Sequence, residues 1–128
     1  MTMGVFSVVL YGGGVDRLYE GVSFLASACA RRDRCILFLR GPALKAFVDG
    51  RWGTPPAVLS EDSFQFQHST PADFLRDLRE QGGVRVYACS AWVRLLKLGP
   101  KLVAERVDAV IGLNAFLAQA QGGPILTF

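Results

Sequence analysis

The chain has 128 residues and carries 14 basic against 11 acidic side chains, for a formal net charge of +3. That length predicts a single domain spanning 1–128. The basic residues are scattered, so we expect no nucleic-acid-binding surface. All apolar runs are shorter than the ~20 residues that a membrane-spanning helix needs. A mean hydropathy of +0.29 is high for a monomer of this size, and we interpret it as apolar surface buried between subunits.

The cysteine content indicates a reducing environment. Three cysteines is an odd number, their spacing is not that of a zinc site, and the chain has one histidine. Residues 1–4 include no basic region of the kind that opens a secretory signal peptide. We therefore expect a cytoplasmic protein with reduced thiols, no bound metal and no cofactor.

The first predicted elements are a strand over 4–11 and a helix that begins at residue 15. The strand is almost continuously apolar, which is typical of a strand covered on both faces of a parallel sheet. Between these elements the chain turns at three glycines: Gly12, Gly13 and Gly14. They match neither the dinucleotide fingerprint nor the Walker pattern, so a tight turn is favoured over a phosphate site. Because this turn should share a sheet edge with Cys89, the three glycines remain candidate substrate-binding residues.

A second buried strand is predicted over 35–39, followed by a short helix over 41–48. Cys35 begins that strand, and Cys29 lies on the apolar stripe of the preceding helix. Cysteine is among the most buried residue types, so we interpret both as core residues.

The segment over 49–69 shows no periodicity. A stretch of this length without secondary structure is often functional. Its aromatic residues Trp52, Phe64 and Phe66 would form either a lid or contacts to a second subunit, and the high hydropathy favours subunit contacts. His68 could take a proton from Cys89 only if the fold brought the two together, and a loop histidine without a special role is the favoured interpretation.

The candidate reactive group comes after the next helix. Thr70 is followed by a proline and, three residues on, by an acid, which predicts a helix start. The sequence VRVYAC (84–89) alternates as a strand does, and helical spacing runs from Ser90 to the stop at Gly99-Pro100. Cys89 therefore falls where a strand ends and a helix begins, at the edge where open α/β sheets bind ligands.

The residues that follow Cys89 complete the candidate site: Ser90, Ala91 and Trp92. The N–H groups at the start of a helix favour a thiolate over a thiol, and Trp92 would either shield a bound sulfur or fill the core. Because a cysteine at a strand–helix corner is usually reachable, we expect Cys89 to be alkylated well before Cys29 and Cys35. Arg94 and Lys97 are expected at the far end of the same helix and are not counted as catalytic.

The last third of the chain predicts a short helical turn over 101–106, a strand over 107–111, a helix over 113–121 and a strand over 124–128. The inner face of that last helix is expected to include Leu113, Phe116 and Leu117. Strands alternating with helices imply right-handed βαβ units. The predicted fold class is α/β, with three layers around a parallel sheet of about five strands.

The sequence VRVYAC, an apolar helix after it, and the later sequence VDAVIGLNAFLAQAQGGPILTF (107–128) resemble the DsrE/DsrF-like sulfur-relay family, which includes the Tus and Dsr sulfur-transfer subunits. The resemblance spans nearly the whole chain and is best from Thr70 to Phe128. It implies a single DsrE-like domain of flavodoxin-like appearance that assembles as a homotrimer or homohexamer. It also implies that Cys89 holds sulfur as a persulfide between a sulfur donor protein and an acceptor protein.

The resemblance leaves two other functions open. Some family members lack the cysteine and serve as partner subunits, so this chain could be a non-catalytic subunit in which Cys89 is incidental. A weaker alternative is a small-ligand-binding or nucleotide-binding module that uses the glycine turn. One subgroup has a Cys-x-x-Cys pattern at this position. Trp92 stands where the second of those cysteines would be, which argues against a local redox dithiol.

Overall fold

A computed structural model describes residues 4–31, 33–56 and 70–128. Its strands are β1 (Val5–Leu10), β2 (Arg34–Leu39), β3 (Val84–Cys89), β4 (Ala109–Ile111) and β5 (Ile125–Thr127). Its helices are α1 (Val15–Ala30), α2 (Gly41–Val48), α3 (Pro71–Glu80), α4 (Ser90–Leu95), α5 (Pro100–Arg106) and α6 (Leu113–Ala120). The strands form one sheet in the order β4-β3-β2-β1-β5, and every neighbouring pair is parallel. The expected α/β fold is confirmed.

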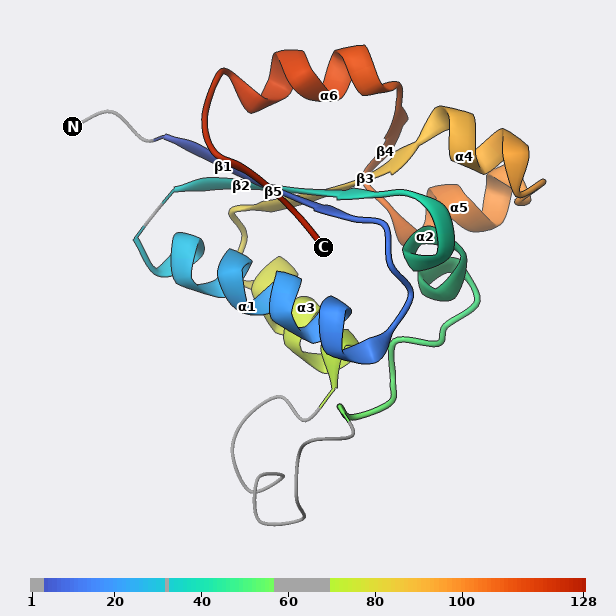
Figure 1. Ribbon diagram of the computed structural model, residues 1–128, viewed down its shortest axis with the longest axis horizontal. Coiled ribbons are helices and arrows are strands. Elements are labelled where there is room, and N and C mark those ends of the chain that lie inside the picture. The colour runs from blue at the N-terminus through green and yellow to red at the C-terminus, as the bar shows by residue number, and fades with distance from the viewer. Residues whose placement is uncertain (1–3, 32, 57–69) are drawn as a thin grey trace.

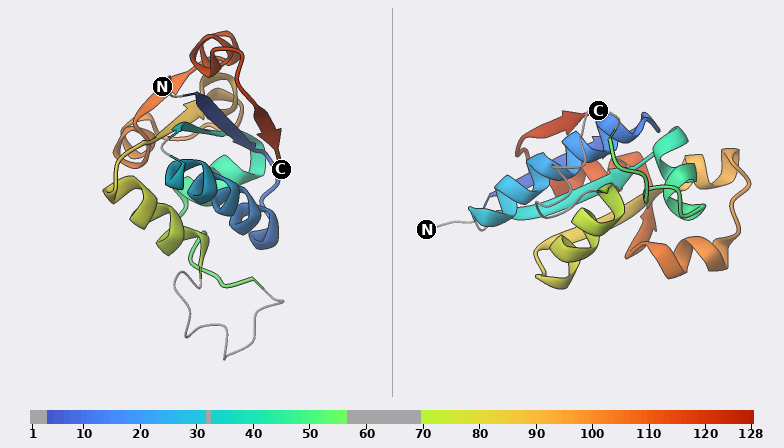
Figure 2. Two further views of the ribbon diagram at one scale, coloured as in Figure 1. Left: turned by 90° about the vertical axis from the view of Figure 1, so that its left-hand side faces the viewer. Right: turned by 90° about the horizontal axis from the view of Figure 1, so that it is seen from below.

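The elements form three layers. Helices α1 and α3 cover one face of the sheet and α6 crosses the other, as Figure 1 and the left view of Figure 2 show. Helices α2, α4 and α5 lie beyond the carboxyl ends of the strands (Figure 1). In a parallel sheet all strands end at the same edge, so the loops and helices that follow them meet there.

Two separate hydrophobic clusters fill the space between the layers. The larger lies on the α1 and α3 face and includes Leu37, Leu39 and Val86. The smaller lies on the α6 face and includes Phe38, Cys89 and Phe116. Side chains of a strand alternate between the faces of its sheet, so β2 contributes to both clusters and its residues 35–39 are all buried.

The start of α3 is formed as the sequence predicts. The backbone N–H of Asp73 donates to Oγ1 of Thr70 at 3.1 Å, and Pro71 occupies the first turn. A side-chain cap of this kind satisfies one of the backbone N–H groups that a helix start leaves without a partner. After α3, Gly82 and Gly83 have φ values of +77° and +90°, a region that favours glycine, and they lead the chain into β3.

The helix after Cys89 ends earlier than expected. Helix α4 stops at Leu95, and Pro100 begins α5 instead of ending α4. Lys97 adopts a left-handed conformation with φ of +53°, and the N–H of Leu98 donates to the carbonyl of Val93 at 3.0 Å. This is a Schellman-type helix end, in which glycine usually occupies the left-handed position. Because lysine stands there, the sequence shows no stop signal at the observed end of α4, and the signal at Gly99-Pro100 comes after it.

Two expectations about packing need correction, and the interpretation of three further residues stays untested. Trp52 is 2% exposed and its Nε1 donates to the carbonyl of Ala43 at 3.3 Å, so it belongs to the core and is neither a lid nor a subunit contact. Leu113 and Leu117 face outward, because α6 buries Phe116 and Ala120 instead. Phe64, Phe66 and His68 lie outside the described residues.

The last two strands are shorter than predicted, at three residues each. Backbone pairing nevertheless continues past β5, where the N–H of Phe128 donates to the carbonyl of Val9 at 2.9 Å. Among the residues described, no helix combines the length and the apolar character that crossing a membrane requires.

Candidate functional site

Cys89 lies at the strand–helix junction that the sequence predicts. It is the last residue of β3 and the residue before the first turn of α4, with φ of −73° and ψ of 120°. The sheet edge that it occupies is the one at which α/β proteins bind ligands. Helix α4 has six residues and is shorter than expected, so its aligned peptide dipoles contribute less at this position than a long helix would.

The side chain of Cys89 is buried, contrary to the expectation that it is reachable. It is 1% exposed and belongs to the α6-face cluster with Val9, Phe38 and Phe116. Phe116 stacks on Phe38 with ring centroids 4.4 Å apart and planes at 5°, which fixes α6 against this face. In the conformation described, a reagent reaches the thiol only after local opening.

The residues after Cys89 differ in their exposure. Ala91 is exposed, Ser90 and Trp92 are half-buried, and no residue of α4 is fully buried. Trp92 packs against both hydrophobic clusters, and its ring meets that of Tyr11 edge-on at 5.6 Å and 70°. Trp92, together with the partly buried Val93, therefore holds α4 over the junction.

The three glycines form the loop that reverses the chain between β1 and α1, and the expected tight turn is not assigned there. A Cβ added at Gly12 would lie 2.9 Å from Cδ of Arg17, and one at Gly13 would lie 3.1 Å from Cβ of Pro42. The N–H of Gly12 already donates to the carbonyl of Phe128 at 3.2 Å. Close packing on Pro42 explains the absence of a side chain at Gly13, whereas the neighbour of Gly12 is a flexible arginine side chain and Gly14 has open space around it.

The glycine turn and Cys89 do not line one cavity. Gly13 borders a cavity of about 720 Å³ whose other lining residues include Lys45 and Arg51. Both cations already have a carboxylate partner in Asp49, at 3.0 Å and 4.0 Å. The structure therefore places the turn at the predicted edge of the sheet without joining it to the thiol.

Sequence reasoning missed Arg40, which follows β2 directly. Leu39 pairs with Ala88, so Arg40 occupies the register position beside Cys89. Its backbone is extended, with φ of −138° and ψ of 162°, and strand alternation places it on the face of Phe38. Its Nε is buried and has no hydrogen-bond partner. The signal was present in the strand CILFLR, where arginine ends an otherwise apolar run at the predicted ligand edge.

Cys29 and Cys35 form a thiol pair that the sequence did not indicate. Sγ of Cys29 donates to Sγ of Cys35 at 3.4 Å, on the sheet face opposite Cys89. When Cys29 ionises, Cys35 becomes the donor, and this hydrogen bond lowers the pKa of Cys29 against the opposing effects of burial and of Asp33. The same hydrogen bond and burial raise the pKa of Cys35. Cys35 is 2% exposed, so the prediction that it is a core residue is confirmed. Cys29 is only partly buried.

The described residues contain no group of three or more His, Cys, Asp or Glu side chains arranged to hold a metal ion. The groups that the structure places beside Cys89 itself are the guanidinium of Arg40 on the adjacent strand, the hydroxyl of Ser90 and backbone groups.

The sequence matches no family model and no curated protein. The structure is similar to that of the ychN protein from E. coli, with a TM-score of 0.59 and 18% sequence identity over 99% of this chain and 100% of that one. It is also similar to MTH1491 from Methanobacterium thermoautotrophicum, described as a protein of unknown function, with a TM-score of 0.53 and 17% identity over 99% and 100% of the two chains. At these identities the likeness shows a shared fold, and it fits the DsrE/DsrF-like fold expected from the sequence.

The burial of Cys89 reverses the order of thiol labelling that the sequence predicts. With the isolated protein and brief iodoacetamide treatment near neutral pH, we expect Cys29 to be alkylated at least about tenfold faster than Cys89, because a fully buried thiol must wait for local opening. The lowered pKa of Cys29 makes more thiolate available at that pH. Peptide mapping gives the modified sites. Cys35→Ala removes the hydrogen bond and should slow labelling of Cys29, whereas faster labelling of Cys89 in the unaltered chain would contradict this description.

Proposed function

We propose that this protein is a sulfur carrier that holds a persulfide on Cys89 and passes sulfur between protein thiols. The observation that carries the proposal is a single cysteine at the carboxyl edge of a parallel sheet, beside the buried and unpartnered Nε of Arg40. No counterion for Arg40 is found among the described residues, and such a guanidinium suits an anionic group, of which a persulfide anion is one. All three cysteines are free of disulfides, which fits a cytoplasmic location, and we include that location in the proposal.

The transfer step needs no external oxidant or reductant. The thiolate of Cys89 attacks the outer sulfur of a donor persulfide, and a new S–S bond forms between Sγ of Cys89 and that sulfur. The S–S bond of the donor breaks, and the donor cysteine leaves as a thiolate that takes up the proton released by Cys89. An acceptor cysteine then repeats the same exchange on the persulfide of Cys89.

Because Cys89 is buried, a persulfide on it would be sheltered, and the protein would have to open locally before sulfur could be transferred. A persulfide beneath Trp92 would be protected from water and from unwanted thiols. Helix α4 is short, and none of its residues is fully buried, so its displacement by a partner protein would break few contacts. The donor and acceptor proteins would have to supply that displacement.

A non-catalytic partner subunit of the same fold is the second candidate. The observation that favours it is the 1% exposure of Cys89, which is also what a small apolar core residue would show. In that case, the thiol would gain no sulfur from any donor, and the fold would serve to present surfaces to other subunits.

Sulfur loading separates the two candidates. Incubated with a persulfide donor, the protein should gain the mass of one sulfur atom on Cys89, and a thiol reductant should remove it. Cys89→Ser should abolish this gain while leaving the fold intact, because a serine hydroxyl at the N-cap of α4 can accept a hydrogen bond from a backbone N–H of the first turn and so has a partner although it is buried. Intact mass spectrometry with peptide mapping measures both effects.

The matched control is Cys35→Ser, which removes a buried thiol from the opposite face of the sheet and should leave loading of Cys89 unchanged. It should lower stability, because the new hydroxyl is buried in an apolar cluster. Equal sulfur uptake by Cys89→Ser would place the carrier site elsewhere. No uptake by the unaltered protein from any donor would make the non-catalytic subunit the better account.

We further propose a homo-oligomer, a trimer or a hexamer as the sequence resemblance implies. Large apolar side chains are exposed on α4, on α5, on the edge strand β4 and on α6, which crosses one face of the sheet (Figure 1). These residues are Leu95, Leu102, Val110, Leu113 and Leu117, with exposed fractions of 40–68%. An apolar surface of this kind is typical of subunit contacts.

Light scattering after size exclusion tests the assembly. We expect a mass of three or six times 13.9 kDa at micromolar concentration. Leu117→Lys should shift the protein toward smaller species, because it places a charge in the proposed contact. The control Ile125→Lys adds the same charge at the opposite edge of the sheet, where Ile125 is 39% exposed, and should leave the mass unchanged. A monomer in the unaltered protein would overturn this proposal.

A further inference from the structure

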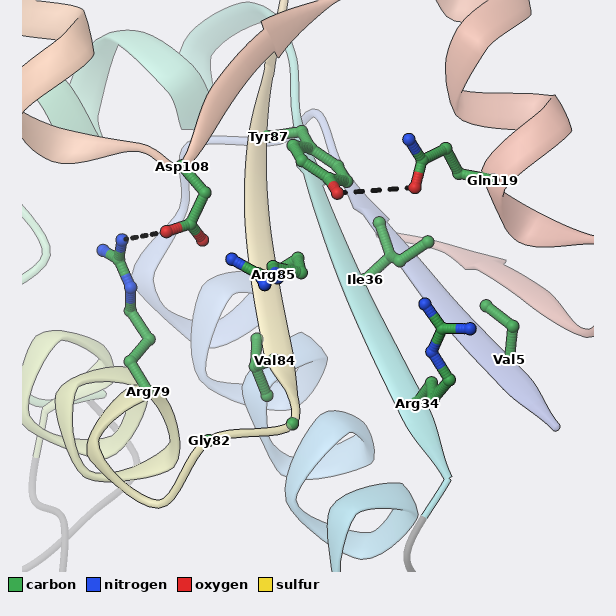
Figure 3. A pocket seen from close by; sticks show the side chains of 11 residues that line it. Val5, Arg34, Ile36, Arg79, Gly82, Val84, Arg85, Tyr87, Asp108 and Gln119 are labelled. Atoms are coloured by element: carbon green, nitrogen blue, oxygen red, sulfur yellow. Dashed lines mark hydrogen bonds and ion pairs between the residues drawn. The ribbon is translucent and has the colours of Figure 1, made fainter. Parts of the chain in front are cut away.

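The amino ends of the strands contain a cavity of about 660 Å³ on the side away from the carboxyl edge. Figure 3 shows its floor, formed by the first residues of β2 and β3, with Val5 of β1 at one side and Gln119 of α6 above. Strand β4 pairs only with residues 87–89 of β3, so the first residues of β3 have no neighbouring strand on that side. The cavity lies over these residues. One eight-residue helix, α6, crosses this face of the sheet.

Three arginines line the cavity, and one of them is already paired. Nη2 of Arg79 lies 3.5 Å from Oδ1 of Asp108, and its Nη1 donates to the carbonyl of Arg106 at 2.9 Å. Oδ2 of Asp108 in turn accepts from the backbone N–H of Val86 at 2.7 Å. These contacts join α3 to the start of β4, so Arg79 and Asp108 have a structural role and neutralise each other.

The other two arginines, Arg34 and Arg85, have no carboxylate partner among the described residues that line the cavity or elsewhere in the described part of the chain. Arg85 pairs in register with Ile36, so Arg34 stands two residues away from it on the adjacent strand. Long side chains at such diagonal positions reach one another, and like charges there repel. Both side chains are exposed, so solvent screens part of this repulsion, but no carboxylate of the described residues neutralises it.

The remaining walls are aromatic and apolar. Ile36 and Val5 lie between the arginines and α6, and the hydroxyl of Tyr87 donates to Oε1 of Gln119 at 3.4 Å (Figure 3). The cavity thus has a doubly cationic end and an apolar side with polar groups at its rim. Its volume falls in the range of roughly 300–1,000 Å³ that is usual for small-molecule sites.

We propose that this cavity binds a phosphorylated small molecule, with the phosphate dianion between Arg34 and Arg85 and the organic part against Ile36 and Tyr87. Guanidinium groups bind phosphate oxygens in a bidentate manner, and two of them match the charge of a phosphate monoester. Cys89 is four residues beyond Arg85 on β3, about 13 Å along the strand, and it does not line the cavity. The site is therefore separate from the proposed sulfur chemistry and does not depend on it.

Isothermal titration calorimetry at low ionic strength tests the proposal on the full chain. The probes are ribose 5-phosphate, inorganic phosphate and ribose, each titrated to about 10 mM. We expect saturable binding of ribose 5-phosphate, weaker binding of inorganic phosphate, no binding of ribose, and a loss of affinity as salt is added.

Arg34→Gln and Arg85→Gln should each weaken binding of ribose 5-phosphate at least about tenfold, because each removes one charged bidentate contact. Both side chains are exposed, so the variants should fold, and circular dichroism checks this. The control Arg94→Gln removes an exposed arginine from α4 and should leave the affinity unchanged. The proposal fails if no probe binds, if inorganic phosphate binds as tightly as ribose 5-phosphate, or if the control loses as much affinity as the two cavity variants.

Discussion

The parallel arrangement of all five strands is the constraint on which the rest of this structure depends. It requires β2 to be covered on both faces, and the residues of that strand from Cys35 to Leu39 are all buried. The stack of Phe38 on Phe116 supplies that cover on the α6 face. The same arrangement brings the end of every strand to one edge of the sheet, where Arg40 and Cys89 become neighbours although they are far apart in the sequence.

The sheet also separates the cysteines. Cys29 and Cys35 hydrogen bond to each other on the α1 face, whereas Cys89 lies in the cluster on the α6 face. A persulfide on Cys89 would therefore have no cysteine of its own chain beside it to resolve it into a disulfide. This separation suits a carrier that releases its sulfur to another protein. It also keeps the Cys29–Cys35 pair away from Cys89, on the other face of the sheet.

The sequence predicts the fold well because its strongest signals are local. Continuous apolar runs identify β1 and β2, and Thr70 with its proline marks the start of α3. The misses concern interactions between distant segments. The burial of Trp52 depends on α2, the burial of Cys89 depends on α6, and the Cys29–Cys35 contact depends on how α1 returns to β2.

The candidate site is predictable in its position and not in its accessibility. Alternation and helical spacing place Cys89 at the end of β3, since both are read from neighbouring residues. The exposure of the thiol also depends on Phe116, which belongs to the same cluster and comes from a helix more than 20 residues later, and Trp92 packs against that cluster. The early end of α4 escaped prediction because Lys97 occupies a left-handed position that glycine usually signals.

The central claim is that Cys89 carries sulfur beneath a cover provided by Trp92. The most direct measurement is a time course of sulfur loading on Cys89 from a small persulfide donor, followed by intact mass in the unaltered chain, in Trp92→Ala and in Arg94→Ala. The account predicts that Trp92→Ala loads at least about tenfold faster, because buried thiols react through local opening. Arg94 is an exposed residue of the same helix, so Arg94→Ala should load at the rate of the unaltered chain. Failure of Cys89 to gain sulfur in all three proteins, or an unchanged rate in Trp92→Ala, would contradict the account.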